Sequence, residues 1–413
     1  VQMALGSVVV LTTSTLNRLM VVELALPALL PGFLVALHYG IQITRPNWGF
    51  LSDTGGNRTR WMLLGMAVLA AGGLLAATGV VVLETNYAAG LSLSILAYAL
   101  IGLGVGASGT SVLALLATAT APHRRAAAAT ITWLMMIFGI AVTAGVVGSF
   151  LDPYSPARLI HVVASVCSAA LVLTVLATWG IERGVQADPE PATVPFREGL
   201  KDVWSEPAAR AFTIFVFLAM TAFFMQELIL EPYAGLVFGF TPGQSTQLSG
   251  MQNGGVFIGM LLVGIAATGL RIGTLRAWVV SGCIGSAATL CVIAGIGSSG
   301  SQALLSGATV ALGFFNGVFA VAAIGSMMAL AGQGREKREG TRMGLWGAAQ
   351  AIAAGFGGLT GAALVDLMRQ FTTDAPAFGT VFLIEAALFI AAAAMAHRIM
   401  PGRAPAANLV PGE

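Results

Sequence analysis

Three polar side chains that could bind a ligand lie together in one apolar run of this sequence. His38, Gln42 and Arg45 stand at positions i, i+4 and i+7, which places them on one face of a helix. A neutral imidazole or an amide oxygen there could ligate the magnesium of a chlorophyll-type pigment, and Arg45 could bind a carboxylate, a phosphate or a lipid headgroup. The alternative is that His38 and Gln42 hydrogen-bond to a neighbouring helix while Arg45 extends to the membrane surface.

Two further polar groups lie near the ends of apolar runs. Asn17 and Arg18 are in the first run, and Glu227 and Glu231 are spaced i, i+4 in the seventh. Because these runs are equivalent in the two halves of the chain, we expect Arg18 to contact Glu227 or Glu231, as a gate or as a permanent clasp. The alternative is two separate interfacial groups that water solvates.

Composition identifies the protein class. The chain has 413 residues, of which 57% are hydrophobic and 9% charged, and its mean hydropathy is +0.86. Soluble domains carry about 25% charged residues, so this is a polytopic membrane protein. The net charge of +2 gives no basic field for nucleic acid. No Ser/His/Asp arrangement, metal cluster or G-x-x-x-x-G-K-[ST] sequence occurs, so we predict no enzymatic activity and no metal except a pigment magnesium at His38.

The hydropathy pattern predicts an all-α fold of twelve transmembrane helices, because each apolar window is long enough to cross about 30 Å of hydrocarbon. The predicted organisation is a six-helix bundle over 1–181, a cytoplasmic linker over 182–207, a second six-helix bundle over 208–400 and a cytoplasmic tail over 401–413. The windows are 3–22, 27–46, 61–83, 89–118, 126–150, 158–180, 208–231, 246–269, 277–297, 301–331, 342–367 and 378–399.

One glycine-rich stretch, Gly104 to Gly109, formally satisfies the dinucleotide-binding pattern G-x-G-x-x-G. A dinucleotide site needs a strand before the glycines and an acidic residue after them, whereas this stretch lies in an apolar run. We therefore interpret these glycines as sites of close helix packing.

The distribution of basic residues predicts the orientation. Nearly all arginines and lysines fall in alternate loops, whereas the opposite loops hold essentially Arg158 and Arg369. By the positive-inside rule, both termini are cytoplasmic. One basic loop has Gly49, Asp53, Gly56 and Arg58 in the pattern G-x-x-x-D-x-x-G-x-[RK]. This pattern resembles the loop signature of the major facilitator superfamily after its second transmembrane helix, which implies two six-helix halves around a central space.

Four stretches resemble a narrower family, the bacteriochlorophyll-delivery branch of this fold, which contains the PucC- and LhaA-type light-harvesting assembly proteins. The stretches are TLNRLMVVEL (15–24), RPNWGFLSD (45–53), LEPYAGLVFGFTPGQSTQL (230–248) and REGTRMGLWGAAQ (338–350). The resemblance implies a protein of the bacterial inner, intracytoplasmic photosynthetic membrane that assembles light-harvesting complex 1 or 2 around the reaction centre.

The resemblance also implies ligands and partners. The cofactor would be bacteriochlorophyll, with a carotenoid or lipid as further candidates. The partners would be antenna polypeptides, the reaction-centre core, a pigment synthase or membrane insertase, and membrane lipids. Two other functions stay open: a secondary transporter of a lipophilic or pigment-like solute, and a permanent structural subunit of the photosynthetic complex.

Overall fold

A computed structural model describes residues 1–45, 47–48, 57–120, 125–182, 204–270, 272–331 and 339–400. Within these residues, eleven helices are long and apolar enough to cross a membrane, and Leu29–Thr44 is a twelfth, shorter apolar helix. The predicted all-α, twelve-helix class is confirmed. The second helix is shorter than its predicted window because regular structure starts only after Pro27 and tightens into a 3₁₀ turn at Gln42.

The N-terminal half starts with a helix that is interrupted twice. Its π-helical turns, η1 and η2, coincide with polar residues in an otherwise apolar segment. The elements of this half are α1 (Gln2–Val10), η1 (Leu11–Thr15), α2 (Leu16–Arg18), η2 (Leu19–Glu23), α3 (Leu29–Ile41), η3 (Gln42–Thr44), α5 (Arg58–Leu83), α6 (Tyr87–Ala119), α7 (Arg125–Leu151) and α8 (Pro156–Thr178).

The C-terminal half repeats this layout with longer, mostly regular helices. Its first two helices, α10 and α11, both have proline in the first turn, where a missing N–H costs nothing. The elements are α10 (Pro207–Phe238), α11 (Pro242–Gly264), η5 (Ile265–Gly269), α12 (Leu275–Gly295), η6 (Ile296–Ser298), α13 (Gln302–Ala331), α14 (Glu339–Arg369) and α15 (Asp374–Ile399).

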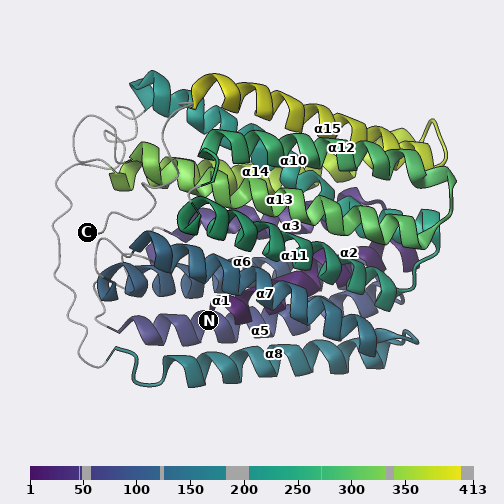
Figure 1. The fold of residues 1–413 in the computed structure, drawn as a ribbon. Helices are drawn as coiled ribbons and strands as arrows, with labels where there is room; N and C mark the ends of the chain where they lie inside the picture. The colour runs from purple at the N-terminus through teal and green to yellow at the C-terminus, as the bar shows by residue number, and fades with distance from the viewer. Residues whose placement is uncertain are drawn as a thin grey trace.

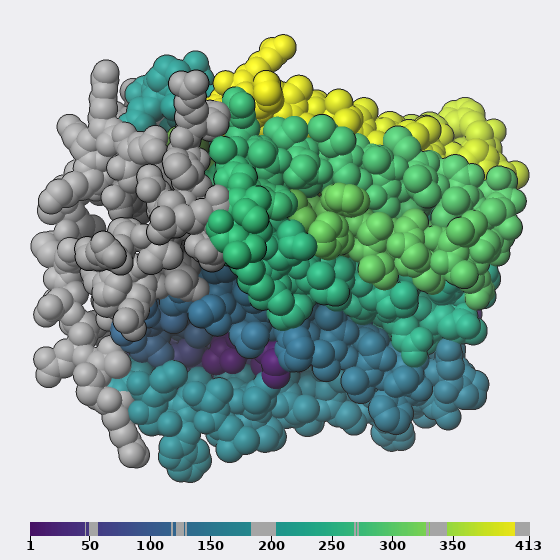
Figure 2. Space-filling view, viewed as in Figure 1, coloured from purple at the N-terminus to yellow at the C-terminus, as the bar shows by residue number. Residues whose placement is uncertain are grey.

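The helices of both halves run nearly parallel to one another along the length of the molecule (Figure 1). One large cluster of buried apolar residues belongs to α10–α15, and a second is built almost entirely from helices of the N-terminal half. The two halves meet along a seam between the blue and green surfaces in Figure 2. We call the end with the short turns between helices, at the right of Figure 1, the turn end.

Glycines permit the closest helix contacts within the N-terminal half. A Cβ at Gly104 of α6 would lie 2.6 Å from the Leu69 nitrogen, and a Cβ at Gly65 of α5 would lie 2.5 Å from the Ser108 nitrogen. Any larger residue would therefore push α5 and α6 apart. The packing interpretation of Gly104 agrees with this geometry.

Glycines also permit close contact between the two halves. A Cβ at Gly148 of α7 would lie 2.5 Å from the Gly243 oxygen of α11, and a Cβ at Gly250 of α11 would lie 2.8 Å from the Gly145 nitrogen. At the other contact between the halves, a Cβ at Gly32 of α3 would lie 3.0 Å from Cβ of Ala362 in α14. The α7–α11 and α3–α14 pairs therefore hold the halves together at backbone distance.

Candidate functional site

Hydrogen bonds join three polar residues near the end of the second helix, which we call the α3 polar chain: His38 in α3, Gln42 in η3 and Arg45 just after η3. The Gln42 amide nitrogen lies 3.1 Å from His38 Nε2, and the Arg45 guanidinium donates a hydrogen bond to Gln42 Oε1. His38 is 2% exposed and Gln42 is 5% exposed. The predicted common face is therefore present. These contacts join the three residues to one another, whereas the sequence interpretation offered a ligand or a neighbouring helix as the partner.

One ring nitrogen of the α3 polar chain is available to a ligand. His38 Nδ1 is buried and has no hydrogen-bond partner in the described part of the chain. A buried, unpaired ring nitrogen costs free energy unless a partner satisfies it. Because Gln42 Oε1 accepts from Arg45, the Gln42 amide N–H donates to Nε2, and the proton of the neutral imidazole lies on Nδ1. Nδ1 can ligate a pigment magnesium only in the other tautomer, with the proton on Nε2 and the Gln42 amide turned to accept it. A ligand must nevertheless reach a closely packed position, since a Cβ at Gly102 of α6 would lie 2.6 Å from the His38 oxygen.

The first helix contacts the C-terminal half through Asn17. Pro232 lies inside α10 and has no N–H to donate to the carbonyl oxygen of Leu228. Asn17 Nδ2 donates to that oxygen at 2.8 Å, and Asn17 is 1% exposed. The amide of one half therefore satisfies the backbone group that proline leaves unpaired in the other half.

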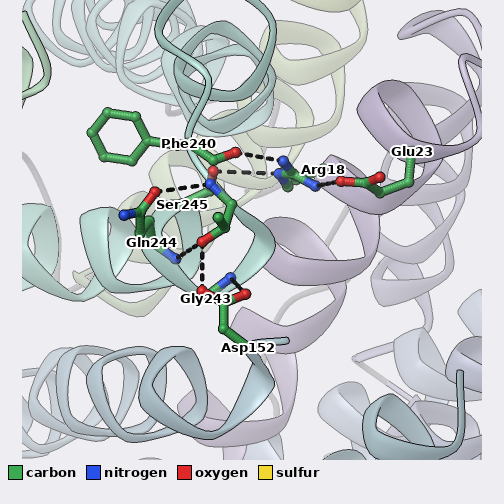
Figure 3. Close-up of polar contacts among 8 residues, drawn as sticks. Arg18, Glu23, Asp152, Phe240, Gly243, Gln244 and Ser245 are labelled. Carbon is green, nitrogen blue, oxygen red and sulfur yellow. Dashed lines mark hydrogen bonds and ion pairs between the residues drawn. The ribbon is translucent and has the colours of Figure 1, made fainter. Parts of the chain in front are cut away.

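Arg18 joins the halves beside Asn17, with a partner that differs from our expectation. Figure 3 shows Arg18 between Glu23 of its own helix and the segment from Phe240 to Ser245. Arg18 forms its ion pair with Glu23, and it donates to the Phe240 oxygen at 2.7 Å and to Ser245 Oγ at 3.3 Å. Glu231 lies within range of the Arg18 charge, but the direct partners of the guanidinium in the described part of the chain do not include the expected Glu227 or Glu231.

The two glutamates of α10 face the interrupted part of the first helix. Glu227 faces the Thr13 hydroxyl, and Glu231 faces the hydroxyls of Ser14 and Ser249. Glu231 is 3% exposed, and its Oε2 has no hydrogen-bond partner among the described residues. Both carboxyl groups thus lie at the contact between the halves, where sequence reasoning placed them only by helix equivalence.

Two aspartates that the sequence interpretation did not select also join the halves at the turn end. Asp152 follows α7 and accepts hydrogen bonds from the Gly243 nitrogen, at 3.0 Å, and from the Thr241 hydroxyl, at the start of α11 (Figure 3). Asp366 of α14 accepts from the nitrogens of Ala28 and Leu29, at 3.0 and 2.7 Å, at the start of α3. Both are helix N-terminal contacts made by a carboxylate from the opposite half.

The loop signature is only partly described. Gly49, Asp53 and Gly56 lie outside the described residues. Arg58 begins α5, and the nitrogens of Arg58 and Thr59 donate to the Glu182 carboxylate at 2.8 and 3.1 Å. Glu182 was predicted as the first residue of a linker, and the structure adds to it the role of a helix cap.

Comparison with known proteins gives a match along nearly the whole chain. A family model described as "PUCC protein" matches residues 15–404. A Rhodobacter capsulatus protein named "Bacteriochlorophyll synthase 44.5 kDa chain" is 67% identical over 98% of this chain and 95% of its own length. Proteins named "Protein PucC" are 30% identical in Rhodobacter capsulatus, over 96% of this chain and 89% of theirs, and 30% identical in Cereibacter sphaeroides, over 93% and 87%.

Solved structures share the fold at low sequence identity. The crystal structure of a D-xylose–proton symporter superposes with a TM-score of 0.72 at 16% identity, covering 97% of this chain and 96% of that one. A bacterial homolog of the human lysosomal transporter Spinster gives a TM-score of 0.68 at 14% identity, covering 99% and 95%. The predicted major facilitator fold is confirmed by these transporters.

One prediction is wrong. We predicted from the absence of catalytic motifs that the chain is not an enzyme. The relative that is 67% identical over nearly its full length is named as a chain of a synthase. The absent motifs are those of soluble enzymes. A membrane-bound enzyme or one of its subunits need not contain them, so their absence does not exclude enzymatic activity.

Proposed function

Because this chain belongs to the PucC protein family, we propose that it binds bacteriochlorophyll and delivers it to antenna polypeptides as light-harvesting complex 1 or 2 assembles around the reaction centre. The relative that carries bacteriochlorophyll in its name supports the pigment class. The observation on which the proposal depends is the buried Nδ1 of His38, which has no partner in the described part of the chain.

In this proposal, the α3 polar chain holds the pigment. His38 ligates the magnesium through Nδ1 in the tautomer that carries its proton on Nε2, which gives the pigment a fixed position against the protein. The Gln42 amide turns so that its oxygen accepts the Nε2 proton, and it thereby fixes the imidazole orientation. This turn releases the Arg45 guanidinium from Gln42 Oε1, so that it can bind a carbonyl or carboxylate group of the pigment. A carotenoid or a lipid remains a further candidate ligand.

The proposed partners are antenna polypeptides, the reaction-centre core, and a pigment synthase or membrane insertase. The synthase is the partner with the most direct support, since the relative at 67% identity is named as one of its chains. We propose that delivery takes place in the intracytoplasmic photosynthetic membrane, where pigment and antenna helices share one lipid phase.

An absorption spectrum of the gently purified protein tests the proposal, provided that antenna and reaction centre have been removed. We expect a red-shifted bacteriochlorophyll band that co-elutes at a fixed ratio. His38→Ala should lower the bound pigment without changing expression, whereas His397→Ala, at an exposed position of α15, should leave it unchanged. A colourless, stable wild-type protein would contradict the proposal, and unchanged pigment in His38→Ala would exclude His38.

A second candidate is a secondary transporter of a lipophilic or pigment-like solute. It is favoured by the fold shared with solved transporters and by Glu227 and Glu231 at the contact between the halves. Carboxyl groups at that position are typical of proton-coupled transport. Uptake into proteoliposomes that depends on a proton gradient, and that Glu231→Gln abolishes, would support it. A fixed stoichiometric copy in purified core complexes would instead indicate a structural subunit.

A further inference from the structure

A groove between α7 and α8 opens on the outside of the N-terminal half. Its volume is about 650 Å³. Its walls are mostly apolar, and two of the wall residues, Val146 and Phe150, are 51% and 66% exposed. The polar groups all come from the first part of α8 and the turn before it: Ser155, Arg158, His161 and Ser165.

His161 is the unusual residue of this groove. Its side chain is exposed, and neither ring nitrogen has a hydrogen-bond partner among the described residues, although its carbonyl accepts a bond from Ser165 at 2.8 Å. The helix begins at Pro156, so His161 lies about 8 Å along it at 1.5 Å per residue. A helix of 23 residues is about 35 Å long, and the hydrocarbon layer is about 30 Å thick. With α8 centred across the hydrocarbon layer, His161 lies inside that layer, where an unpaired polar group is costly.

The depth of His161 distinguishes between ligands. A phospholipid phosphate lies at the headgroup level, where Arg158 could reach it, but the imidazole is deeper than that level. Arg158 donates one N–H to the Pro153 oxygen at 2.8 Å, which leaves further N–H groups for a carbonyl or carboxylate. Apolar walls, an unpaired imidazole and a guanidinium suit a ligand with a large apolar body, a metal that accepts an imidazole nitrogen, and a polar edge.

We propose that His161 is the axial ligand of a magnesium tetrapyrrole that binds in this membrane-facing groove, with Arg158 at the polar edge of the macrocycle. The site is separate from the α3 polar chain and would let a pigment enter the protein from the lipid phase. The inference rests on the proposed function for the identity of the pigment, but its residues and its location are independent of His38.

The test compares two pigments that differ only in the metal. Wild-type protein in lipid nanodiscs would be titrated with bacteriochlorophyll and with bacteriopheophytin, which has no magnesium. We expect the wild type to bind the magnesium pigment at least about tenfold more tightly, a difference of roughly 1.4 kcal/mol. In a His38→Ala background, which removes the other proposed magnesium ligand, His161→Leu should lose this preference, and His161→Gly should regain it when imidazole is added. The matched control is His397→Leu, which removes an exposed histidine outside the groove.

The groove itself is tested by Val146→Trp, which should weaken the binding of both pigments by filling the space. A protein with both His38→Ala and His161→Leu that keeps the full preference for magnesium pigment overturns the inference, as does an equal loss of both pigments. If His38→Ala alone removes the preference, the proposed function holds at α3 and the groove site is wrong. If the wild-type protein binds neither pigment, the proposed function is wrong, and the groove site is wrong with it. Thermal unfolding of each variant identifies misfolded protein.

Discussion

At the scale of single residues, the contact between the halves depends on polar groups that satisfy helix backbone across the seam. Asp152 follows the fifth helix of the N-terminal half and caps α11, the second helix of the other half. Asp366 lies in the last turn of the fifth helix of the C-terminal half and caps α3, the second helix of the N-terminal half. The two contacts are equivalent under exchange of the halves.

Neutralising these aspartates should loosen the turn end. Because an N-terminal helix cap contributes about 1 kcal/mol, we expect Asp152→Ala and Asp366→Ala each to lower the free energy of unfolding by roughly 0.5–2 kcal/mol. Spin labels placed across the seam at the turn end should report longer distances. Asp374→Ala is the control, since Asp374 pairs with Arg369 of the same half at 2.8 Å. An equal effect in all three variants would contradict a specific role at the seam.

Asn17 and Pro232 should be energetically coupled. Asn17→Ala leaves the Leu228 carbonyl without its donor, so we expect a loss of about 1–3 kcal/mol, the cost of an unsatisfied buried group. In a Pro232→Ala background, the alanine N–H can bond to Leu228, and the same Asn17→Ala change should cost less. A double-mutant cycle of unfolding free energies in detergent measures the coupling. Simple additivity of the two changes would show that Asn17 acts elsewhere.

At the scale of elements, small residues fix how closely helices approach. Gly145 and Gly148 are one turn apart on α7. A Cβ at Gly148 would point at the α11 backbone, whereas a Cβ at Gly145 would meet no atom within 4 Å. The first helix is contacted at its π-helical turn η1, where Tyr98 of α6 donates to the Thr12 oxygen at 2.9 Å.

The two glycines of α7 provide a matched test of the α7–α11 contact. Gly148→Ala places a methyl group 2.5 Å from the Gly243 oxygen, so the helices must separate, and overpacking of this kind costs roughly 1–3 kcal/mol. Gly145→Ala meets no atom within 4 Å and should be neutral or slightly stabilising. Melting temperatures in one detergent measure both variants. A Gly148→Ala protein as stable as wild type would mean that the helices separate without cost.

At the scale of the whole molecule, the distribution of basic residues leads to a prediction about orientation. We propose that both termini are cytoplasmic and that the turn end faces the periplasm. A fluorescent protein fused to the C-terminus should be bright, and alkaline phosphatase at the same position should be inactive. Phosphatase inserted in the turn between α14 and α15, near Gln370, should be active. The reverse pattern would show the opposite orientation in the membrane, with the Asp152 and Asp366 contacts on the cytoplasmic side.

The sequence by itself determined the class, the helix count and the family. These properties are local or additive: about 20 apolar residues suffice to span a membrane wherever they occur, and the stripe of His38, Gln42 and Arg45 follows from helix periodicity alone. The interpretation of Gly104 as a packing residue also needed only its apolar context.

Partners across the seam were decided only by the tertiary structure. The sequence indicated that Asn17 and Arg18 would contact the other half, but the acceptors are backbone oxygens of Leu228 and Phe240. Pro232 marks the Leu228 oxygen as lacking its helix donor, but no residue pattern shows that Asn17 lies beside it or that the Phe240 oxygen is within reach of Arg18. Asp152 and Asp366 were missed for the same reason, because a carboxylate at a helix end becomes a cap only when another helix starts beside it. Comparing the ends of the fifth helices in the two halves could have revealed this pair.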